Sequence, residues 1–307
     1  MDIVVVGDIN VDVVLAGLPS LPAFGKLKHA KNMKFTLGGS SAIFAHNIAR
    51  LGAATGFIGK VGKDHLGDFL IDTLKTVGVD TSRMVRDPAL PTGVCVVMSF
   101  PQDYAMVSYP GIRESFALQE IDIDYVKRAR HLHLSSFYLQ PGLQPGCVEL
   151  FRAAKSAGLT TSLDPDHDPR EKWNGGIQEL LHDIDLFLPN GLEATRIARM
   201  PELSAAAKFL AGFGHTAVIK LGANGVRVVS GNQSLSSPPI AVQPVDTTGA
   251  GDSFNAGFVF QHLQGAPLQK CAAWGNACGA LSTRALGGTE AFPSVSEVEK
   301  FLTEHEQ

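Results

Sequence analysis

Short apolar runs alternate along the chain with segments in which apolar residues recur every three or four positions. The apolar runs, which predict buried strands, cover residues 3–6, 54–58, 131–134, 160–163, 186–188, 217–220 and 225–229. The segments with helical spacing cover residues 42–51, 66–77, 147–157, 205–213 and 253–263. Strands that alternate with helices on this scale predict an α/β fold with a mainly parallel sheet and helices on both faces.

Two stretches, residues 8–37 and 91–112, follow a different pattern. Apolar residues alternate within them with period two, as at Val94, Val96 and Met98. We expect these stretches to form a small separate sheet that projects from the main body as a lid. Because the chain shows no repeat, linker or low-complexity tract, the expected organisation is one domain over residues 1–307 with this lid inserted in it.

Composition and charge narrow the class of protein. The chain has 307 residues, of which 45% are hydrophobic and 18% charged, enough apolar material for a large buried core. Its formal net charge is -4 without a Lys/Arg-rich run, which argues against a nucleic-acid or anionic-membrane partner. The four cysteines lack zinc-ligand spacing, no apolar stretch is long enough for a bilayer, and the chain opens directly on an apolar run. These features predict a cytoplasmic location.

The strongest chemical signal is the stretch 246–253, DTTGAGDS, which leads into an apolar helical run. Gly249, Ala250 and Gly251 would let a ligand approach the backbone, and the helix start offers free N–H groups and a positive dipole end to a phosphoryl group. The carboxylate of Asp252 could accept the proton of an attacking hydroxyl there. For an isolated Gly-x-Gly-Asp, a simple helix cap is the competing interpretation.

Five motifs in order along the chain resemble signatures of the ribokinase (PfkB) family of carbohydrate kinases. They are residues 7–12 (GDINVD), residues 38–42 (GGSSA) with Ala45, Asn47, Ala49 and 50–52, residues 190–193 (NGLE), residues 220–225 (KLGANG) and residues 246–252 (DTTGAGD). Neither GxxxxGK[ST] nor GxGxxG occurs in the chain, so no other phosphate loop competes. The resemblance implies a ribokinase-like three-layer sandwich with a small β-sheet lid, and transfer of the γ-phosphoryl group of ATP to a hydroxyl of a small carbohydrate.

The resemblance also implies a role for each matching residue. Asp252 resembles the catalytic base, and the backbone of residues 249–251 resembles the anion hole. The residues that resemble sugar contacts are Asn10, Asp12, Gly38, Gly39 and Ser40, and those that resemble nucleotide contacts are Asn190, Lys220, Gly222, Gly225 and Asn276. Glu193 and Asn190 resemble a pair that holds Mg²⁺ through water. Some of these residues also have a simpler interpretation. Without the resemblance, Asp12 would be a solvated loop acid and residues 38–39 a glycine turn. Residues 190–193 would be a helix cap, and Lys220 a lysine at the end of a strand.

The chain departs from the family pattern at two positions of the expected site. Ser40 stands where relatives that act on phosphorylated sugars carry a lysine, which favours an unphosphorylated sugar of the ribose, fructose or keto-deoxy sugar acid class. Asp166 stands where many members carry Asn, which leaves its role open. The alternatives are a nucleoside kinase of the same fold and a non-catalytic sugar-sensing protein. An intact base beside Gly-Ala-Gly counts against the latter, because binding alone needs no base.

The resemblance extends to a site for a monovalent cation. The residues that match positions around the family's cation loop are Asp246, Thr248, Arg284 and Gly288, with backbone carbonyls doing most of the binding. We therefore expect K⁺ to stimulate the enzyme. A small sheet of about four strands has little core of its own and exposes pairing edges. Stacking two such sheets face to face would bury Val94, Val96 and Met98, so a homodimer through the lid is expected.

Overall fold

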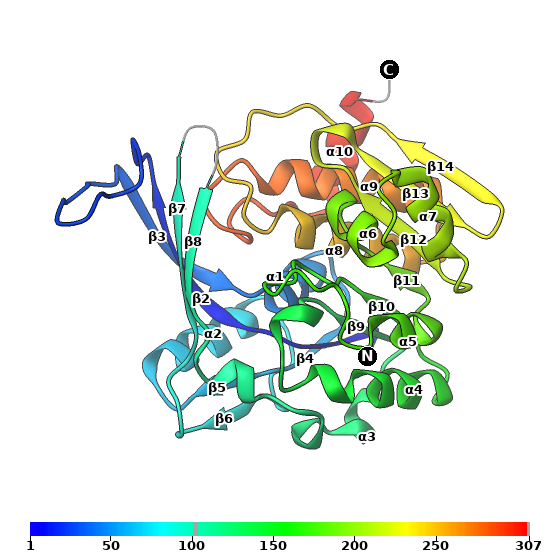
Figure 1. Cartoon of the computed structure of the whole chain (residues 1–307), viewed down its shortest axis with the longest axis horizontal. Helices are drawn as coiled ribbons and strands as arrows, with labels where there is room; N and C mark the ends of the chain where they lie inside the picture. Colours follow the sequence, from blue (N-terminus) through cyan, green and yellow to red (C-terminus); the bar gives the residue numbers. More distant parts are fainter. Residues whose placement is uncertain (101–103, 306–307) are drawn as a thin grey trace.

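The computed structural model describes residues 1–100 and 104–305 and confirms the predicted α/β fold (Figure 1). Its main sheet has eight strands in the order β14-β13-β12-β11-β10-β9-β1-β4. The strands from β12 to β4 are parallel to one another, whereas β13 and β14 are antiparallel to their neighbours. The parallel strands therefore end on the same edge, which gathers the loops that follow them.

The elements have the following bounds. The main-sheet strands are β1 (Ile3–Val6), β4 (Thr55–Ile58), β9 (His131–Leu134), β10 (Thr160–Leu163), β11 (Leu186–Phe187), β12 (Thr216–Lys220), β13 (Val226–Ser230) and β14 (Gln233–Ser237). The α-helices are α1 (Ser40–Arg50), α2 (His65–Thr76), α3 (Ile123–Val126), α4 (Cys147–Ser156), α5 (Ile177–Leu180), α6 (Gly191–Ala198), α7 (Leu203–Ala211), α8 (Ala250–Leu263), α9 (Leu268–Ser282) and α10 (Val295–His305). A short parallel pair, β5 (Lys60–Gly62) and β6 (Val85–Asp87), lies apart from the main sheet.

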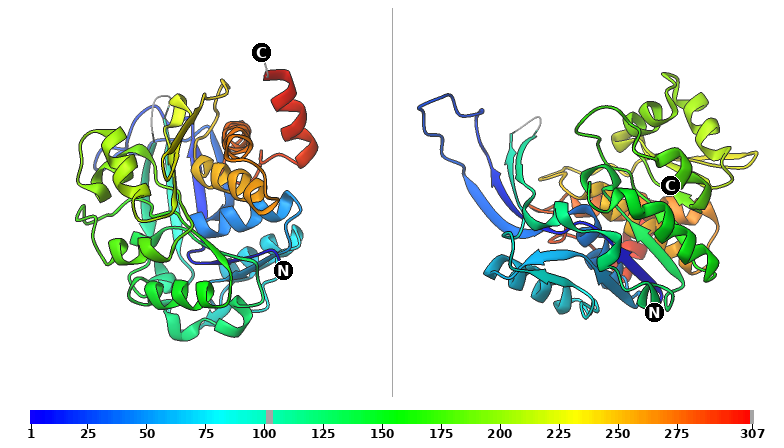
Figure 2. Two further views of the ribbon diagram at one scale, coloured as in Figure 1. Left: turned by 90° about the vertical axis from the view of Figure 1, so that its right-hand side faces the viewer. Right: turned by 60° about the horizontal axis from the view of Figure 1, so that its bottom comes forward.

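The alternation of side chains along β1 explains the layers. Successive residues of a strand point to opposite faces of the sheet. Ile3 and Val5 pack into one buried cluster with residues of α1, α2, α8, α9 and α10, and Val4 and Val6 pack into another with residues of α3 to α7. The sheet is therefore covered by helices on both faces (Figure 2). Among the described residues, no helix is long and apolar enough to cross a bilayer.

A separate four-stranded sheet comes from the two stretches that alternate with period two. Its order is β3 (Asn32–Gly38), β2 (Asn10–Ala16), β7 (Val94–Ser99) and β8 (Tyr104–Tyr109), and it projects beside the main body (Figure 1). Residues 101–103 of the predicted stretch 91–112 lie outside the described residues, and the end of that stretch enters the 3₁₀ helix η1 (Gly111–Ser115). The small separate sheet that the sequence predicted is therefore confirmed.

The register of the small sheet gives its two faces different chemistry. Phe35, Val13, Val96 and Val107 are paired across the sheet, as are Thr36, Asp12, Cys95 and Ser108, so these two rows lie on opposite faces. We call the first the outer face and the second the inner face. One prediction needs correction: Val94 is half-buried and packs against the main hydrophobic core, so it is not free for a partner. The base of the outer face rests on the body of the protein.

Candidate active site

The glycine turn before α8 shapes the first part of the site. Gly249 has a φ of 71°, and a Cβ there would lie 2.7 Å from Cα of Gly288, so only glycine fits. The N–H groups of Gly249, Gly251 and Asp252 have no hydrogen-bond acceptor among the described residues, whereas the N–H of Ala250 donates to the carbonyl of Thr247 at 3.1 Å. The turn thus leaves three open donors at the positive end of α8, and in this conformation Ala250 contributes none of them.

Asp252 lies in the first turn of α8 and is 8% exposed. Its side chain makes no capping hydrogen bond, so the helix-cap interpretation of this residue is wrong. Burial, and then the charge of Asp164, raises the pKa of Asp252 well above the usual carboxyl range, and Lys220 opposes this rise. A carboxylate that is buried yet does not support its own helix is costly for stability, which is typical of catalytic groups.

Lys220 carries the positive charge near Asp252 and Asp164. Its Nζ donates to a carboxylate oxygen of Asp164 and, at 3.3 Å, to Oδ1 of Asn255. Asn255 in turn donates to the same oxygen of Asp164. Burial disfavours the charge of Lys220, but the carboxylates of Asp164 and Glu193 outweigh burial and raise its pKa. The surrounding carboxylates thus favour the charged form of Lys220. This ammonium lies beside the glycine turn, since a Cβ on Gly251 would be 3.6 Å from Nζ.

A second loop closes against the glycine turn. The carboxylate of Asp246 accepts hydrogen bonds from N and Oγ1 of Thr248 at 3.0 and 2.8 Å and from N of Gly287 at 2.8 Å. Asn47 on α1 donates to the carbonyl of Gly288 and to Oγ of Ser253, both at 3.0 Å. These bonds bring Asp246, Thr248 and Gly288 together beside the start of α8.

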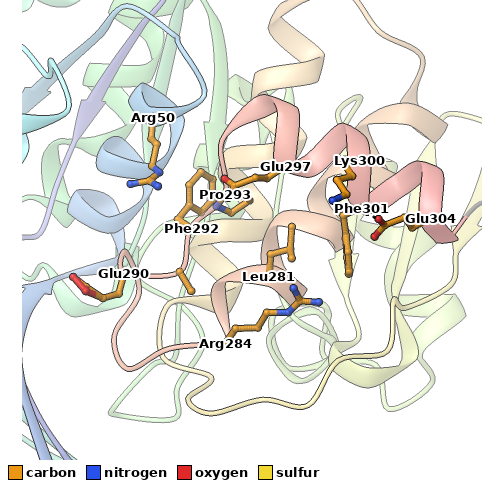
Figure 3. A pocket seen from close by; sticks show the side chains of 11 residues that line it. Arg50, Leu281, Arg284, Glu290, Phe292, Pro293, Glu297, Lys300, Phe301 and Glu304 are labelled. Carbon is orange, nitrogen blue, oxygen red and sulfur yellow. Dashed lines mark ion pairs between the residues drawn. The ribbon is translucent and has the colours of Figure 1, made fainter.

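Arg284 is the predicted cation-loop residue whose side chain turns elsewhere. Its guanidinium lies 5.1 Å from the ring centre of Phe301, in a separate hollow of about 370 Å³ formed with α10 (Figure 3). Arg50, Glu290, Glu297 and Lys300 also line this hollow. The side chain of Arg284 therefore points away from Asp246 and Thr248, and only its backbone could serve a cation there.

The predicted sugar contacts meet between the small sheet and α1. Nδ2 of Asn10 donates to Oδ1 of Asp12 at 2.7 Å, and a Cβ on Gly38 would overlap that carboxylate, at 2.1 Å from Oδ1. Burial raises the pKa of Asp12 to about 7, although the hydrogen bond from Asn10 opposes this rise. Asp12 is thus a buried carboxylate and not a solvated loop acid. Gly39 precedes α1, and Asp8 accepts from N of Ser40 and Ser41 at 3.1 and 3.0 Å.

Asp166 links these residues to Asp252. After their predicted role we call Asp8, Asn10, Asp12, Gly38, Gly39 and Ser40 the acceptor cluster. Oδ2 of Asp166 accepts from Oγ of Ser40 at 3.3 Å and from Oγ of Ser136 at 2.9 Å. Both Asp166 and Asp8 are among the groups whose charges raise the pKa of Asp252. The acceptor cluster and the glycine turn of α8 therefore lie within electrostatic reach of each other.

The predicted nucleotide residues form two neighbouring groups. Asn190 caps α6 and closes a reciprocal capping box with Glu193, so the cap interpretation of this pair describes its own hydrogen bonds. Asn190 also bridges to Lys220 at the end of β12. Farther along, Gly225 packs against the carbonyl of Ser237, and Asn276 donates to the carbonyls of Ser237 and Pro238 at 3.3 and 2.8 Å. Gly222 starts the 3₁₀ turn η6 (Gly222–Asn224) between these two groups.

Comparison with known protein families identifies the family of this chain. The model of the pfkB family carbohydrate kinases matches residues 1–295. The chain belongs to this family. Members of this family are carbohydrate kinases, and this chain is therefore one as well. 

Several relatives and solved structures resemble the chain over most of its length. A sugar kinase of Archaeoglobus fulgidus is 30% identical over 80% of this chain and 98% of its own. An ATP-dependent ribose-1-phosphate kinase of Halopiger xanaduensis is 29% identical over 97% of both chains, and a ribokinase of Bacillus subtilis is 28% identical over 98% and 99%. Arabidopsis thaliana ribokinase, solved with ribose and ATP, has a TM-score of 0.83 at 27% identity over 98% of both chains. An E. coli protein described as ribokinase II, solved with ATP and Mg²⁺, has a TM-score of 0.87 at 24% identity over 99% of both.

Sequence reasoning did not predict three side chains of this site. Asp164 and Asn255 surround Lys220, and Arg113 reaches the acceptor cluster from η1. Asn255 follows Asp252 by three positions, a spacing that places the two on one side of α8 and could have signalled it. Arg113 carried no such signal, because Asn10, to which it donates, lies 103 positions earlier in the chain.

Proposed function

We propose that this kinase transfers the γ-phosphoryl group of ATP to a hydroxyl of a small unphosphorylated sugar, with Asp252 as the general base. The observation that carries the proposal is the buried carboxylate of Asp252 beside the open N–H groups at the start of α8. In the reaction the acceptor hydroxyl gives its proton to Asp252, its oxygen bonds to the γ-phosphorus, and the bond from that phosphorus to the β-phosphate oxygen breaks. ADP leaves with the electron pair of that bond.

The other groups would stabilise charge during transfer. The open N–H groups of Gly249 and Gly251 and the ammonium of Lys220 would stabilise the negative charge that develops on the phosphoryl oxygens. In this role Gly249 and Gly251 act through donors that are open, whereas Ala250 supplies the turn itself. On the acceptor side, Asn10, Asp12 and the backbone of Gly38, Gly39 and Ser40 would orient the sugar, because a carboxylate can accept hydrogen bonds from two hydroxyls at once.

We also propose that the nucleotide lies along the edge formed by Asn190, Lys220, Gly222, Gly225 and Asn276. Glu193 and Asn190 carry oxygen atoms of the kind that Mg²⁺ prefers, and they would hold the ion through water because their own hydrogen bonds occupy them. Mg²⁺ would neutralise charge between the β- and γ-phosphates.

A screen of acceptors tests the proposed function. ADP release from ATP and Mg²⁺ would be followed with ribose, fructose, a keto-deoxy sugar acid, ribose 1-phosphate and a nucleoside as acceptors. We expect one unphosphorylated sugar to support turnover far above the rate without acceptor. If the nucleoside is turned over in preference to the sugars, the acceptor is a nucleoside and not a sugar. ATP binding without turnover of any acceptor would contradict the proposal.

We propose further that K⁺ binds the loop formed by Asp246, Thr248 and Gly288 together with the backbone of Arg284. The support is the network that ties this loop to the glycine turn, since a cation that orders the loop would order the turn as well. We expect K⁺ to raise the rate in sodium-free buffer, and the substitution Asp246→Ala to abolish that increase. Equal rates with K⁺ and with tetramethylammonium would contradict this prediction.

The small sheet is proposed to act as a lid over the acceptor and to assemble a homodimer through its outer face. The inner face carries Asp12, so closure of the sheet would expel water from the attacking hydroxyl. On the outer face Val107 on β8 is 63% exposed, and Met33 and Phe35 on β3, at the opposite edge of the sheet, are also exposed. Such an apolar face on a thin sheet is typical of a surface that a partner covers.

One substitution separates the two faces. We expect light scattering at micromolar concentration to give a dimer mass for the unchanged protein and a monomer mass for Val107→Glu. The control is Met106→Glu, because Met106 is 54% exposed on the inner face and should leave the mass unchanged. A monomeric unchanged protein contradicts the dimer, and a radius of gyration that saturating sugar does not reduce contradicts the lid.

A further inference from the structure

Arg113 joins the acceptor cluster from an element outside the small sheet. The 3₁₀ helix η1 follows β8 and carries this side chain, which is only 11% exposed. Its Nη1 donates to Oδ1 of Asn10 at 2.7 Å, and Nδ2 of Asn10 donates to Oδ1 of Asp12 at 2.7 Å. Arg113 therefore fixes which way the amide of Asn10 points, and through that amide it fixes the carboxylate of Asp12.

Much of the guanidinium is left without an acceptor. Nε of Arg113 is buried and has no hydrogen-bond partner in the part of the chain that the structure describes. Nη2 has a single long contact, 3.4 Å, to Oγ of Ser108, which lies in the same row of the inner face as Asp12. A buried donor of a charged group is costly to leave unpaired. An oxygen atom of the acceptor would satisfy this Nε–Nη2 edge.

The charge around Arg113 selects the kind of oxygen. Nη1 lies 3.9 Å from Oδ2 of Asp8, and the charge of Arg113 acts on the buried carboxylate of Asp12. Asp166, close by, is held by the hydroxyls of Ser40 and Ser136. Among the described residues, Arg113 is the one cation in the hydrogen bonds and ion pairs of this cluster. Its charge is thus already matched by carboxylates, and an acceptor with a carboxylate or phosphate here would add a further negative charge to a buried, acidic site.

We infer that Arg113 is a specificity-determining residue of the acceptor site. Nη1 positions Asn10 and Asp12, and the Nε–Nη2 edge donates to hydroxyl or carbonyl oxygens of the acceptor, so the site takes neutral sugars in preference to sugar acids and sugar phosphates. This inference rests on the proposed function, which it deepens by naming the class of acceptor. The competing explanation is that Arg113 only fastens η1 to the small sheet.

Kinetics with a panel of acceptors test the inference. The unchanged protein should show a kcat/KM for its best neutral sugar at least about 100-fold above those for 2-dehydro-3-deoxygluconate and ribose 1-phosphate, because a like charge in a buried site is strongly disfavoured. In Arg113→Met the KM for the neutral sugar should rise about 10- to 100-fold, the effect of losing a hydrogen bond to a charged group, with a smaller change in kcat. Arg113→Lys should be intermediate, since it keeps the charge and loses the planar fork.

The control variant is Arg83→Gln. Arg83 forms an exposed ion pair with Asp122 at 2.9 Å and lies over the ring of Tyr125, neither of which belongs to the acceptor cluster, so KM and kcat should not change. A purely structural role for Arg113 would lower the melting temperature of Arg113→Met while leaving KM unaltered, and that result overturns the inference. Preferred turnover of an anionic acceptor overturns it as well.

A binding measurement keeps the inference separate from the proposed chemistry. The shift of melting temperature caused by each acceptor would be measured in Asp252→Asn and in Asp252→Asn combined with Arg113→Met. We expect the neutral sugar to raise the melting temperature of Asp252→Asn. The same rise in the double variant should need about 10- to 100-fold more sugar. Stabilisation by the neutral sugar without any turnover in the unchanged protein would contradict the proposed function alone. Equal stabilisation of both variants would contradict the role of Arg113 alone.

Discussion

Asp252→Asn should remove nearly all turnover while the protein stays folded and still binds ATP. Loss of a positioned general base typically lowers the rate by about 10²–10⁴-fold. The side chain makes no capping hydrogen bond, and burial raises its pKa, so removal of the charge should not weaken α8. The measurement is kcat with the sugar identified by the acceptor screen, together with the melting temperature and ATP binding.

A capping aspartate provides the matched control for this variant. Asp64 caps α2 and accepts a hydrogen bond from N of Gly67 at 2.8 Å, so Asp64→Asn tests the same chemical change at a structural site. We expect a small change in stability and unaltered kcat for this control. If Asp252→Asn kept more than about a tenth of the unchanged rate, Asp252 would not be the base.

The pH dependence of turnover follows from the same carboxylate. A base must be ionised, so the rate is retained above its pKa and falls as the pH drops through it. Because burial and Asp164 raise the pKa of Asp252, kcat/KM should begin to fall at a pH above the usual carboxyl value of about 4. Asp12, with a pKa of about 7, contributes to the same acidic limb. A profile that is flat down to pH 5 would contradict both assignments.

Lys220→Met should lower both stability and turnover. The substitution removes the cation that faces Asp164, Glu193 and Asp252, and it leaves buried carboxylates without a counter-charge. Breaking a buried ion pair from one side typically costs about 3–5 kcal/mol of unfolding free energy. Turnover should also fall, because the ammonium beside the glycine turn would no longer stabilise the phosphoryl group. Urea unfolding and kcat measure the two effects.

The loss of stability in Lys220→Met should depend on pH. Burial raises the folded-state pKa values of Glu193 and Asp252, and without the opposing charge of Lys220 these values rise further above the unfolded ones. A group with a raised pKa favours the folded state at low pH, and this contribution is lost as the pH rises. The difference in unfolding free energy from the unchanged protein should therefore be larger at pH 8 than at pH 5.

Lys60→Met is the matched control for Lys220. Lys60 is also buried and pairs with Asp87 and Glu120 at 3.0 and 2.8 Å, outside the candidate site. The Lys60→Met variant should be less stable than the unchanged protein and should have the same kcat. Equal loss of kcat in both variants would show that stability, and not the charge of Lys220 in the site, explains the effect.

Several features of the protein follow from the sequence alone. The alternation of apolar runs with helical spacing predicted the α/β fold, because burial on two faces of a parallel sheet imposes that pattern locally. Bounds differ from prediction by a few residues, as for β4 and α8, where the ends are set by turns. The short motifs also predicted which residues meet at the edge of the sheet, since the stretch 246–252 contains its own turn and helix start.

Other elements were missed because their local pattern is weak or mixed. Helix α9 is apolar on most sides, since it packs against α8 and lies within a core, and so it lacks a clear polar face. Strand β14 is largely exposed at the edge of the main sheet, and its serines and glutamine give no apolar run. The sequence pattern of α9 or β14 cannot be distinguished from that of a loop unless the elements that pack against it are known.

What only the tertiary structure decided is the set of contacts between distant residues. Lys220 meets Asp164 across 56 positions because β12 and β10 belong to one sheet with only β11 between them, and η1 brings Arg113 to Asn10 across 103 positions. Burial then follows from those contacts, and with it the raised pKa of Asp252. The sequence by itself predicted which groups would carry the chemistry. The packing of distant segments decided their charges, their orientation and which side of the small sheet they face, since these depend on neighbours that no local pattern specifies.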